Sequence, residues 1–277
     1  MNSISEIADM AETRRGYIFG AFLSGVLCVL LIVVAIASEG WVVSSASTTD
    51  QYKDSTLQYG LFQGELVLNL LVTPSHNKLY MTCVSDVNAC AVSCKTEAQA
   101  REEEVRALSK GYRPNQACVS VTTVDTSNPL ETPPVIAYSL YISLVTLLIA
   151  HVAVASCAAG LAILNATKNP TEPIFGLPGC LWSNVAAAIV GVTFLLFFGV
   201  YWAVSGWNDH LAFSYTALGL LRPSPHLGFS YWLLLGSCLC SLGNVALLWT
   251  RSYLLERDPP PPTIKLENHS DGTVFLY

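Results

Sequence analysis

Nine cysteines are the residues of this chain whose type and spacing most directly predict chemistry. Four of them share the segment 39–134: Cys83, Cys90, Cys94 and Cys118. An even number of cysteines in one segment predicts two disulfides, provided that the segment lies in an oxidising compartment. Three pairings are possible, and the sequence does not choose among them. A zinc site is the rival interpretation because Cys90 and Cys94 have tolerable ligand spacing, but histidine partners at matching spacing are missing.

The other cysteines fall in or beside long apolar stretches. We expect small packing residues at Cys28, Cys157, Cys238 and Cys240. The Cys238-Leu239-Cys240 spacing does not match the Cys-x-x-Cys motif of thiol oxidoreductases. Cys180 stands at the end of an apolar stretch, where palmitoylation is a reasonable hypothesis.

His151 is the one ionisable side chain in the middle of an apolar stretch. It could relay protons or bind a metal, but a neutral imidazole bonded to a neighbouring helix is the favoured interpretation. Asn244 is the candidate partner. Neither a nucleophile–base pair nor a metal-ligand set is visible in the sequence. We therefore expect no catalytic, cofactor or metal site, and a protein that is not an enzyme.

The elements that must position these residues are four stretches that contain no Asp, Glu, Lys or Arg: 17–38, 135–164, 181–204 and 229–250. Each reaches the length of about 20 residues that an α-helix needs to cross a bilayer. Only 12% of the chain is charged and its mean hydropathy is +0.46, whereas a soluble domain carries about 25% charged residues. The net charge of −6 leaves no basic stripe and argues against nucleic acid as a partner. We predict an all-α membrane protein that forms a four-helix transmembrane bundle.

All six tryptophans lie at or just beyond a predicted helix end, which is typical of residues at the lipid headgroup level. They are Trp41, Trp182, Trp202, Trp207, Trp232 and Trp249. Lys and Arg flank the first span, the connection between spans two and three, and the end of span four. The positive-inside rule then places both termini in the cytoplasm of a multi-pass plasma-membrane protein. We read the first span as an anchor; cleavage after Ala35-Ile36-Ala37 is the alternative.

The predicted organisation has nine parts. Its bounds are 1–16 for the cytoplasmic amino terminus, 17–38, 135–164, 181–204 and 229–250 for the spans, 39–134 and 205–228 for the extracellular loops, 165–180 for a cytoplasmic loop and 251–277 for the cytoplasmic tail. We expect the first extracellular loop to be a small β-rich, disulfide-linked domain. Strands are predicted at 41–43, 59–62, 65–72, 79–84 and 119–124, and a charged helix at 96–110, either a solvated face or a docking surface.

Two further signals concern the cytoplasmic parts. The sequons at Asn165 and Asn268 would lie on the side where they cannot be glycosylated, so either they are accidental or the topology is inverted. The chain ends Phe275-Leu276-Tyr277, and a hydrophobic-x-hydrophobic carboxyl terminus can add a strand to a PDZ-type domain.

Small residues four apart along the spans favour close helix packing and leave oligomer formation possible.

Several segments together resemble the clarin family of four-span proteins. They are Leu57-Gln58-Tyr59-Gly60-Leu61-Phe62-Gln63-Gly64-Glu65, Asn165-Ala166, Pro170-x-Glu172, Gly176-x-x-Gly179, Ser230-Tyr231-Trp232 with Asn244, and Phe275-Leu276-Tyr277. Gly60-Leu61-Phe62 with Trp41 upstream is also similar to the claudin W…GLW pattern. Four cysteines in place of two, and Phe62 in place of Trp, depart from claudins, so paracellular sealing is not implied. The outer segment is longer than expected for a clarin, and it lacks the expected Asn-x-Ser/Thr sequon.

The resemblance implies a membrane organiser of sensory cells, needed for hair-cell or photoreceptor structure and linked to the actin cortex. Its expected partners are the lipid bilayer, other membrane proteins and a PDZ-type scaffold. A claudin-like adhesion or junction protein and an auxiliary subunit of an ion channel are the alternatives. Charge-free spans argue against a channel or transporter in its own right.

Overall fold

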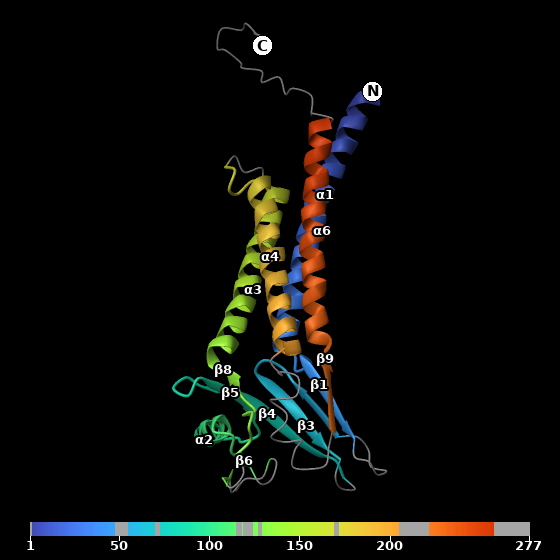
Figure 1. Ribbon diagram of the computed structural model, residues 1–277. Helices are drawn as coiled ribbons and strands as arrows, with labels where there is room; N and C mark the ends of the chain where they lie inside the picture. The colour runs from blue at the N-terminus through green and yellow to red at the C-terminus, as the bar shows by residue number, and fades with distance from the viewer. Residues whose placement is uncertain are drawn as a thin grey trace.

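Four long helices stand side by side at one end of the molecule and a β-sheet lies at the other end (Figure 1). The computed structural model describes residues 2–47, 55–69, 73–114, 118, 124–126, 129–168, 172–204 and 222–257. The long helices are α1 (Asn2–Ala37), α3 (Tyr138–Thr167), α4 (Leu177–Val204) and α6 (Phe229–Arg257). Each is long and apolar enough to cross a bilayer, over Gly16–Ala37, Tyr138–Thr167, Leu177–Val204 and Phe229–Leu254. By length and composition the chain therefore has the four spans that its sequence predicts.

Two helices extend well beyond the predicted spans, at the end of the molecule away from the sheet (Figure 1). The first, α1, begins at Asn2, inside the segment 1–16 that was predicted to precede the first span. No Gly or Pro occurs before Gly16 in this stretch, so nothing interrupts the helix. The other, α6, continues to Arg257 and ends just before Asp258-Pro259, since a residue that precedes proline disfavours the helical conformation.

The helices meet through one stripe of small and apolar side chains each. Helix α1 contacts α3 and α6, and α4 contacts the same two helices. The buried side chains of α3 recur every three or four residues, at Tyr141, Leu144, Leu148, His151, Ala155, Ala158, Ala159, Ala162 and Asn165. Large apolar side chains on the outer faces, such as Ile149 and Leu196, are more than half exposed. This arrangement suits a lipid environment, where small residues allow close helix approach and apolar ones face the hydrocarbon.

The sheet combines strands from both long segments between helices. Its order is β8-β5-β4-β3-β2-β1-β9, and every pair that forms it is antiparallel. The strands are β1 (Val42–Ser47), β2 (Ser55–Tyr59), β3 (Gln63–Leu68), β4 (Ser75–Val84), β5 (Ala89–Ser93), β8 (Ile136–Ala137) and β9 (Arg222–Leu227). The predicted β-region between the first two spans is therefore confirmed. Strands β5, β8 and β9 were not predicted. Strand β8 lies where the second span was expected to begin, and β2 overlaps the strand predicted at 59–62 only at Tyr59.

Strand β9 escaped prediction because its sequence, Arg-Pro-Ser-Pro-His-Leu, is typical of a loop. It pairs along its whole length with β1, from Val42 opposite Leu227 to Ser47 opposite Arg222. Proline is tolerated on an edge strand, where its missing N–H can face away from the neighbour. The two prolines of β9 therefore remove donors that another strand would need in order to extend the sheet at this edge.

Helix α2 (Ala98–Ser109) covers part of the sheet. It packs on β4 and β5, and its buried side chains are Val105 and Leu108. A short ladder joins β6 (Arg113–Pro114) to β7 (Val124–Asp125). The strand predicted at 119–124 lies outside the described residues except for its last one.

Candidate functional site at the sheet–helix junction

The segment with the most specific resemblance to clarins, Leu57–Glu65, forms a hairpin between β2 and β3. Gln58 lies opposite Glu65 and Tyr59 lies opposite Gly64. The Gly60 amide closes the turn by donating to the Gln63 carbonyl at 2.7 Å. Residues 60–62 form the turn at the tip, where the sequence predicted a strand.

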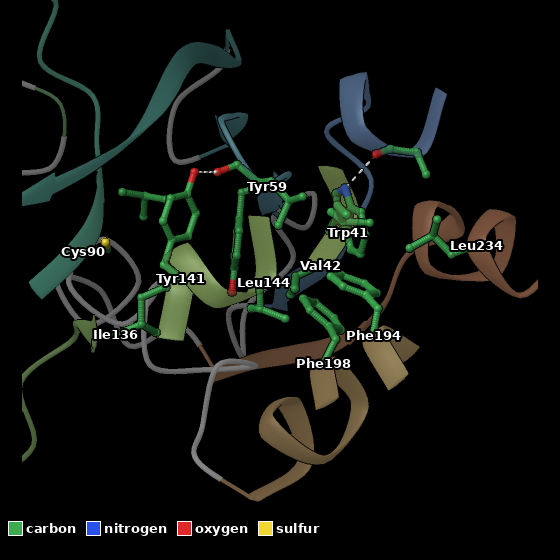
Figure 2. Packing of buried hydrophobic residues seen from close by; sticks show 14 of the residues in the cluster. Trp41, Val42, Tyr59, Cys90, Ile136, Tyr141, Leu144, Phe194, Phe198 and Leu234 are labelled. Carbon is green, nitrogen blue, oxygen red and sulfur yellow. Dashed lines mark hydrogen bonds between the residues drawn. The ribbon is translucent and has the colours of Figure 1, made fainter. Parts of the chain in front are cut away.

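This turn is docked against the helices. The Tyr141 hydroxyl of α3 donates a hydrogen bond to the Leu61 carbonyl at 2.9 Å, as Figure 2 shows. Tyr59 and Leu61 are each only 1% exposed. A side chain on Gly60 would overlap the Ser38 carbonyl oxygen, so the turn approaches the end of α1 as closely as glycine allows. The hairpin is thus held by α3 and by the residues that follow α1.

Trp41 is the second attachment between the sheet and the helices. Its indole N–H donates to the Ala35 carbonyl in the last turn of α1 at 2.8 Å (Figure 2). Its ring lies 5.7 Å from that of Phe194 and 5.2 Å from that of Phe198, between centroids, and both belong to α4. The indole therefore satisfies a helix-end carbonyl that has no partner within the helix.

The prediction that Trp41 lies at the lipid headgroups is wrong, because the residue is 1% exposed and packs inside the protein. The sequence around Trp41 does not reveal this, because a tryptophan next to a helix end can either face the lipid headgroups or pack inside the protein. Trp182, Trp232 and Trp249 are 69%, 57% and 70% exposed on helix surfaces, as a headgroup position requires. Trp202 is partly buried, and Trp207 lies outside the described residues.

The motif residues divide into a buried and an outward-facing set. Tyr59, Gly60, Leu61 and Gly64 are buried and shape the hairpin. A Cβ on Gly64 would lie 2.6 Å from that of Tyr59, so the two strands need glycine here. Phe62 is 46% exposed, and Glu65 lies on the sheet surface with its carboxylate 2.9 Å from His76 Nδ1. Phe62 is therefore exposed to a partner, whereas the Glu65 carboxylate is already paired with His76.

Both predicted disulfides are present, and the structure decides their pairing. Cys83 bridges to Cys90, its direct opposite on the neighbouring strands β4 and β5. Cys94 bridges to Cys118 over a separation of 24 residues. All four sulfurs are thus engaged in disulfides, and the rival zinc site at Cys90 and Cys94 is excluded.

Several charged side chains of α2 contact the sheet or the turn between β4 and β5. Arg106 donates a hydrogen bond to the Asp86 carboxylate, and this bond holds the pKa of that carboxyl below its usual value. The Arg101 guanidinium lies 5.1 Å above the Tyr80 ring centroid, and the Ser93 hydroxyl donates to Glu104. The predicted charged helix at 96–110 is therefore bonded to the sheet along one side, while Glu97, Glu102 and Glu103 remain exposed.

Inside the helices, the predicted pairing of His151 with Asn244 is wrong. The Asn244 amide donates to Asn184 Oδ1 of α4 at 3.0 Å. His151 is fully buried, and neither of its ring nitrogens has a partner among the described residues. A Cβ placed on Gly191 would lie 2.7 Å from His151 Cε1 and 2.6 Å from Cys238 Sγ. The imidazole therefore occupies space that Gly191 leaves open between α3, α4 and α6.

The cysteines outside the sheet differ from one another in exposure. Cys28 and Cys238 are buried, and the Cys28 thiol donates to the Ser237 carbonyl of α6 at 3.4 Å. Cys157 is exposed on α3 and does not act as a packing residue. Cys180 is fully buried and donates to the Ala158 carbonyl, so its thiol is not accessible for palmitoylation. Across the part of the chain that the structure describes, no group of three or more His, Cys, Asp or Glu side chains could hold a metal ion.

The proposed scaffold-binding residues Phe275, Leu276 and Tyr277 lie outside the described residues. Comparison with known proteins adds no relative: no protein-family model matches the chain, and no curated protein matches it.

Proposed function

We propose that this protein is a non-enzymatic, clarin-like organiser of the plasma membrane. Its four helices would form a bundle with both termini in the cytoplasm, and its sheet would face the outside. The distribution of Lys and Arg supports this orientation. The two disulfides support it independently, because disulfides persist in oxidising compartments such as the cell exterior.

The observation that carries the proposal is the attachment of the hairpin to the helices. Gly60, Leu61 and Trp41 join the sheet to α1, α3 and α4 by close contact, by hydrogen bonds and by aromatic packing. A domain held in this way keeps a constant orientation to the bilayer, which an organiser needs in order to present partners at a defined height. The exposed ring of Phe62 stands at the tip of the same hairpin.

The resemblance to clarins supports the cellular role. We propose that the protein organises the membrane and the actin cortex of sensory cells of the hair-cell or photoreceptor type. Its outer domain would bind other membrane proteins, and Phe275–Tyr277 would bind a PDZ-type scaffold in the cytoplasm.

The experiment that tests the proposal uses proximity labelling with the labelling enzyme fused to the amino terminus, so that the carboxyl terminus stays free. Phe62→Ser is compared with Lys78→Ser, a matched change at another exposed position of the sheet. Phe62→Ser should remove membrane-protein neighbours while surface delivery and thermal stability stay unchanged, and Lys78→Ser should leave the neighbours intact. Deletion of Phe275–Tyr277 should remove cytoplasmic scaffold proteins only. An identical set of neighbours for the wild type and both hairpin and tail variants would contradict the organiser role.

A claudin-like adhesion protein is the second candidate, and the sheet topology favours it. Strand β9 brings the second inter-helix segment into the sheet of the first, so the two segments build one outer surface. The prolines of β9 argue against contact by strand addition at that edge. If the adhesion function holds, cells that express the protein will aggregate with one another, and control cells will not.

A further inference from the structure

The short connection between α3 and α4 carries two exposed apolar side chains, Ile174 and Phe175. Ile174 is 73% exposed and Phe175 is 49% exposed. They lie between the end of α3 at Thr167 and the start of α4 at Leu177, and both helices are long and apolar enough to cross a bilayer. A connection between two such ends lies at the boundary of the bilayer, so its side chains meet headgroups and not the hydrocarbon centre.

The described part of this connection, residues 172–176, is a structured turn. The Gly176 amide donates to the Glu172 carbonyl at 2.9 Å, and the Cys180 amide donates to the Gly176 carbonyl at 3.1 Å. A side chain on Gly179 would overlap the Ile174 carbonyl, so the turn lies directly against the first turn of α4. The apolar pair is therefore held outward by backbone contacts.

Asn165 ties the same turn to α3. Its side-chain amide donates to the Phe175 carbonyl at 2.7 Å and to the Leu161 carbonyl of its own helix at 2.8 Å. Asn165 is only 9% exposed, so its side chain lies between the turn and α3. The turn thus contacts both helices, through Asn165 of α3 and through the first turn of α4. Turning Ile174 toward the protein interior would break these contacts.

The exposed pair continues the lipid-facing surface of the helices. Leu164 on α3 is 42% exposed and Trp182 on α4 is 69% exposed, on either side of the turn. Trp249 and Tyr253, near the end of α6, are 70% and 58% exposed at the same end of the molecule. Trp and Tyr prefer the headgroup level. Lys168 is exposed beside the turn, where its ammonium group can reach lipid phosphate.

We propose that the α3–α4 turn is a membrane-surface anchor in which Ile174 and Phe175 insert between phospholipid headgroups and the acyl-chain boundary. The occupant is the bilayer itself, because the apolar pair is continuous with the surface that already faces lipid. The anchor does not depend on which side of the membrane the turn faces, and it is independent of the organiser role. It would fix the depth and tilt of α3 and α4 at the end opposite to the sheet.

The test places an environment-sensitive fluorescent amino acid at position 174 of the full chain in nanodiscs of phosphatidylcholine and phosphatidylglycerol. Matched labels replace Glu172, an exposed polar residue of the same turn, and Lys110, an exposed residue beside the sheet. Lipids brominated near the headgroup end of the acyl chain should quench the label at 174 several-fold more than the label at Lys110. Water-soluble iodide should show the reverse order. For both quenchers, the quenching of the label at Glu172 should be intermediate between that at 174 and that at Lys110.

A second variant tests whether the hydrogen-bonded turn is what keeps position 174 in contact with lipid. Asn165→Ala removes the support on α3, so quenching of the label at 174 by brominated lipid should fall while the helix content stays the same. If the labelled 174 chain does not fold, the label is moved to position 175, for which the same result is expected. Equal quenching by iodide at 174 and at Lys110 would overturn the proposal. So would protection of the label in cell membranes but not in nanodiscs that hold only this protein, because that result identifies a protein partner.

Discussion

The Tyr141 hydroxyl donates to the Leu61 carbonyl across 80 residues of sequence and 2.9 Å of space. This bond joins a membrane-spanning helix to the tip of a β-hairpin, and both residues are buried. Tyr141→Phe leaves the Leu61 carbonyl without its donor and should lower the free energy of unfolding by about 1–3 kcal/mol. Thermal unfolding in detergent measures the change. Ser143→Ala on the exposed face of α3 is the control, and an equal midpoint for both variants would contradict a role for the bond in docking.

Gly191 should tolerate no side chain. Gly191→Ala places a methyl group 2.6 Å from Cys238 Sγ and 2.7 Å from His151 Cε1, so α3, α4 and α6 must move apart. We expect a loss of about 1–3 kcal/mol from overpacking. Gly160→Ala is the matched control, because a Cβ on that helical glycine meets nothing within 4 Å. Its stability should stay unchanged or rise, because alanine favours the helix more than glycine does, and a similar loss for both variants would contradict the packing explanation.

The two disulfides should contribute unequally to the stability of the sheet region. Cys94–Cys118 closes a loop of 24 residues and Cys83–Cys90 one of 7 residues. The chain-entropy model gives the longer loop about 3 kcal/mol and the shorter one about 2 kcal/mol. Thermal unfolding of the paired Cys→Ser variants measures both losses. Non-reducing peptide mapping of the wild type should recover these two pairs, and any other connectivity would contradict the structure.

Asn165 should act as a hydrogen-bond donor and should carry no glycan. Because its amide nitrogen bonds two backbone carbonyls, Asn165→Ala should destabilise the protein by about 1–2 kcal/mol without any change in electrophoretic mass. Thr167→Val removes the sequon but keeps the amide, so it should leave stability nearly unchanged. A glycosidase-sensitive mass shift that either variant abolishes would instead support the inverted topology.

Acid should weaken the attachment of α2 to the sheet. The hydrogen bond from Arg106 lowers the pKa of the Asp86 carboxyl below its usual value of 3.8, so the carboxylate is stabilised in the folded protein. That contribution is present above the unfolded pKa and is lost as pH falls through the folded one. Asp86→Asn should therefore lower the midpoint of thermal unfolding slightly at pH 7, because the pair is exposed, and should lower it less at pH 2. An equal difference at both pH values would rule out the ion pair as the cause.

Local composition is enough to predict the four spans, the presence of two disulfides, and a β-region between the first two helices. Insertion depends on the length and apolarity of a continuous stretch, both of which can be read from neighbouring residues. The same local information explains the errors. A Trp beside a helix end can face lipid or the interior, and Pro223 and Pro225 are typical of a loop until β1 is known to lie beside them.

The sequence by itself determined that this chain has four apolar helices and cysteines suited to disulfides, because helix formation and lipid solubility follow from adjacent residues. Only the tertiary structure decided that Cys94 meets Cys118, that Asn244 meets Asn184, and that Trp41 packs on α4. These contacts join residues that are far apart along the chain, and they form only when the helices and the sheet have come together. The docking of the Leu57–Glu65 hairpin against α3 and the end of α1 is likewise a property of the whole fold.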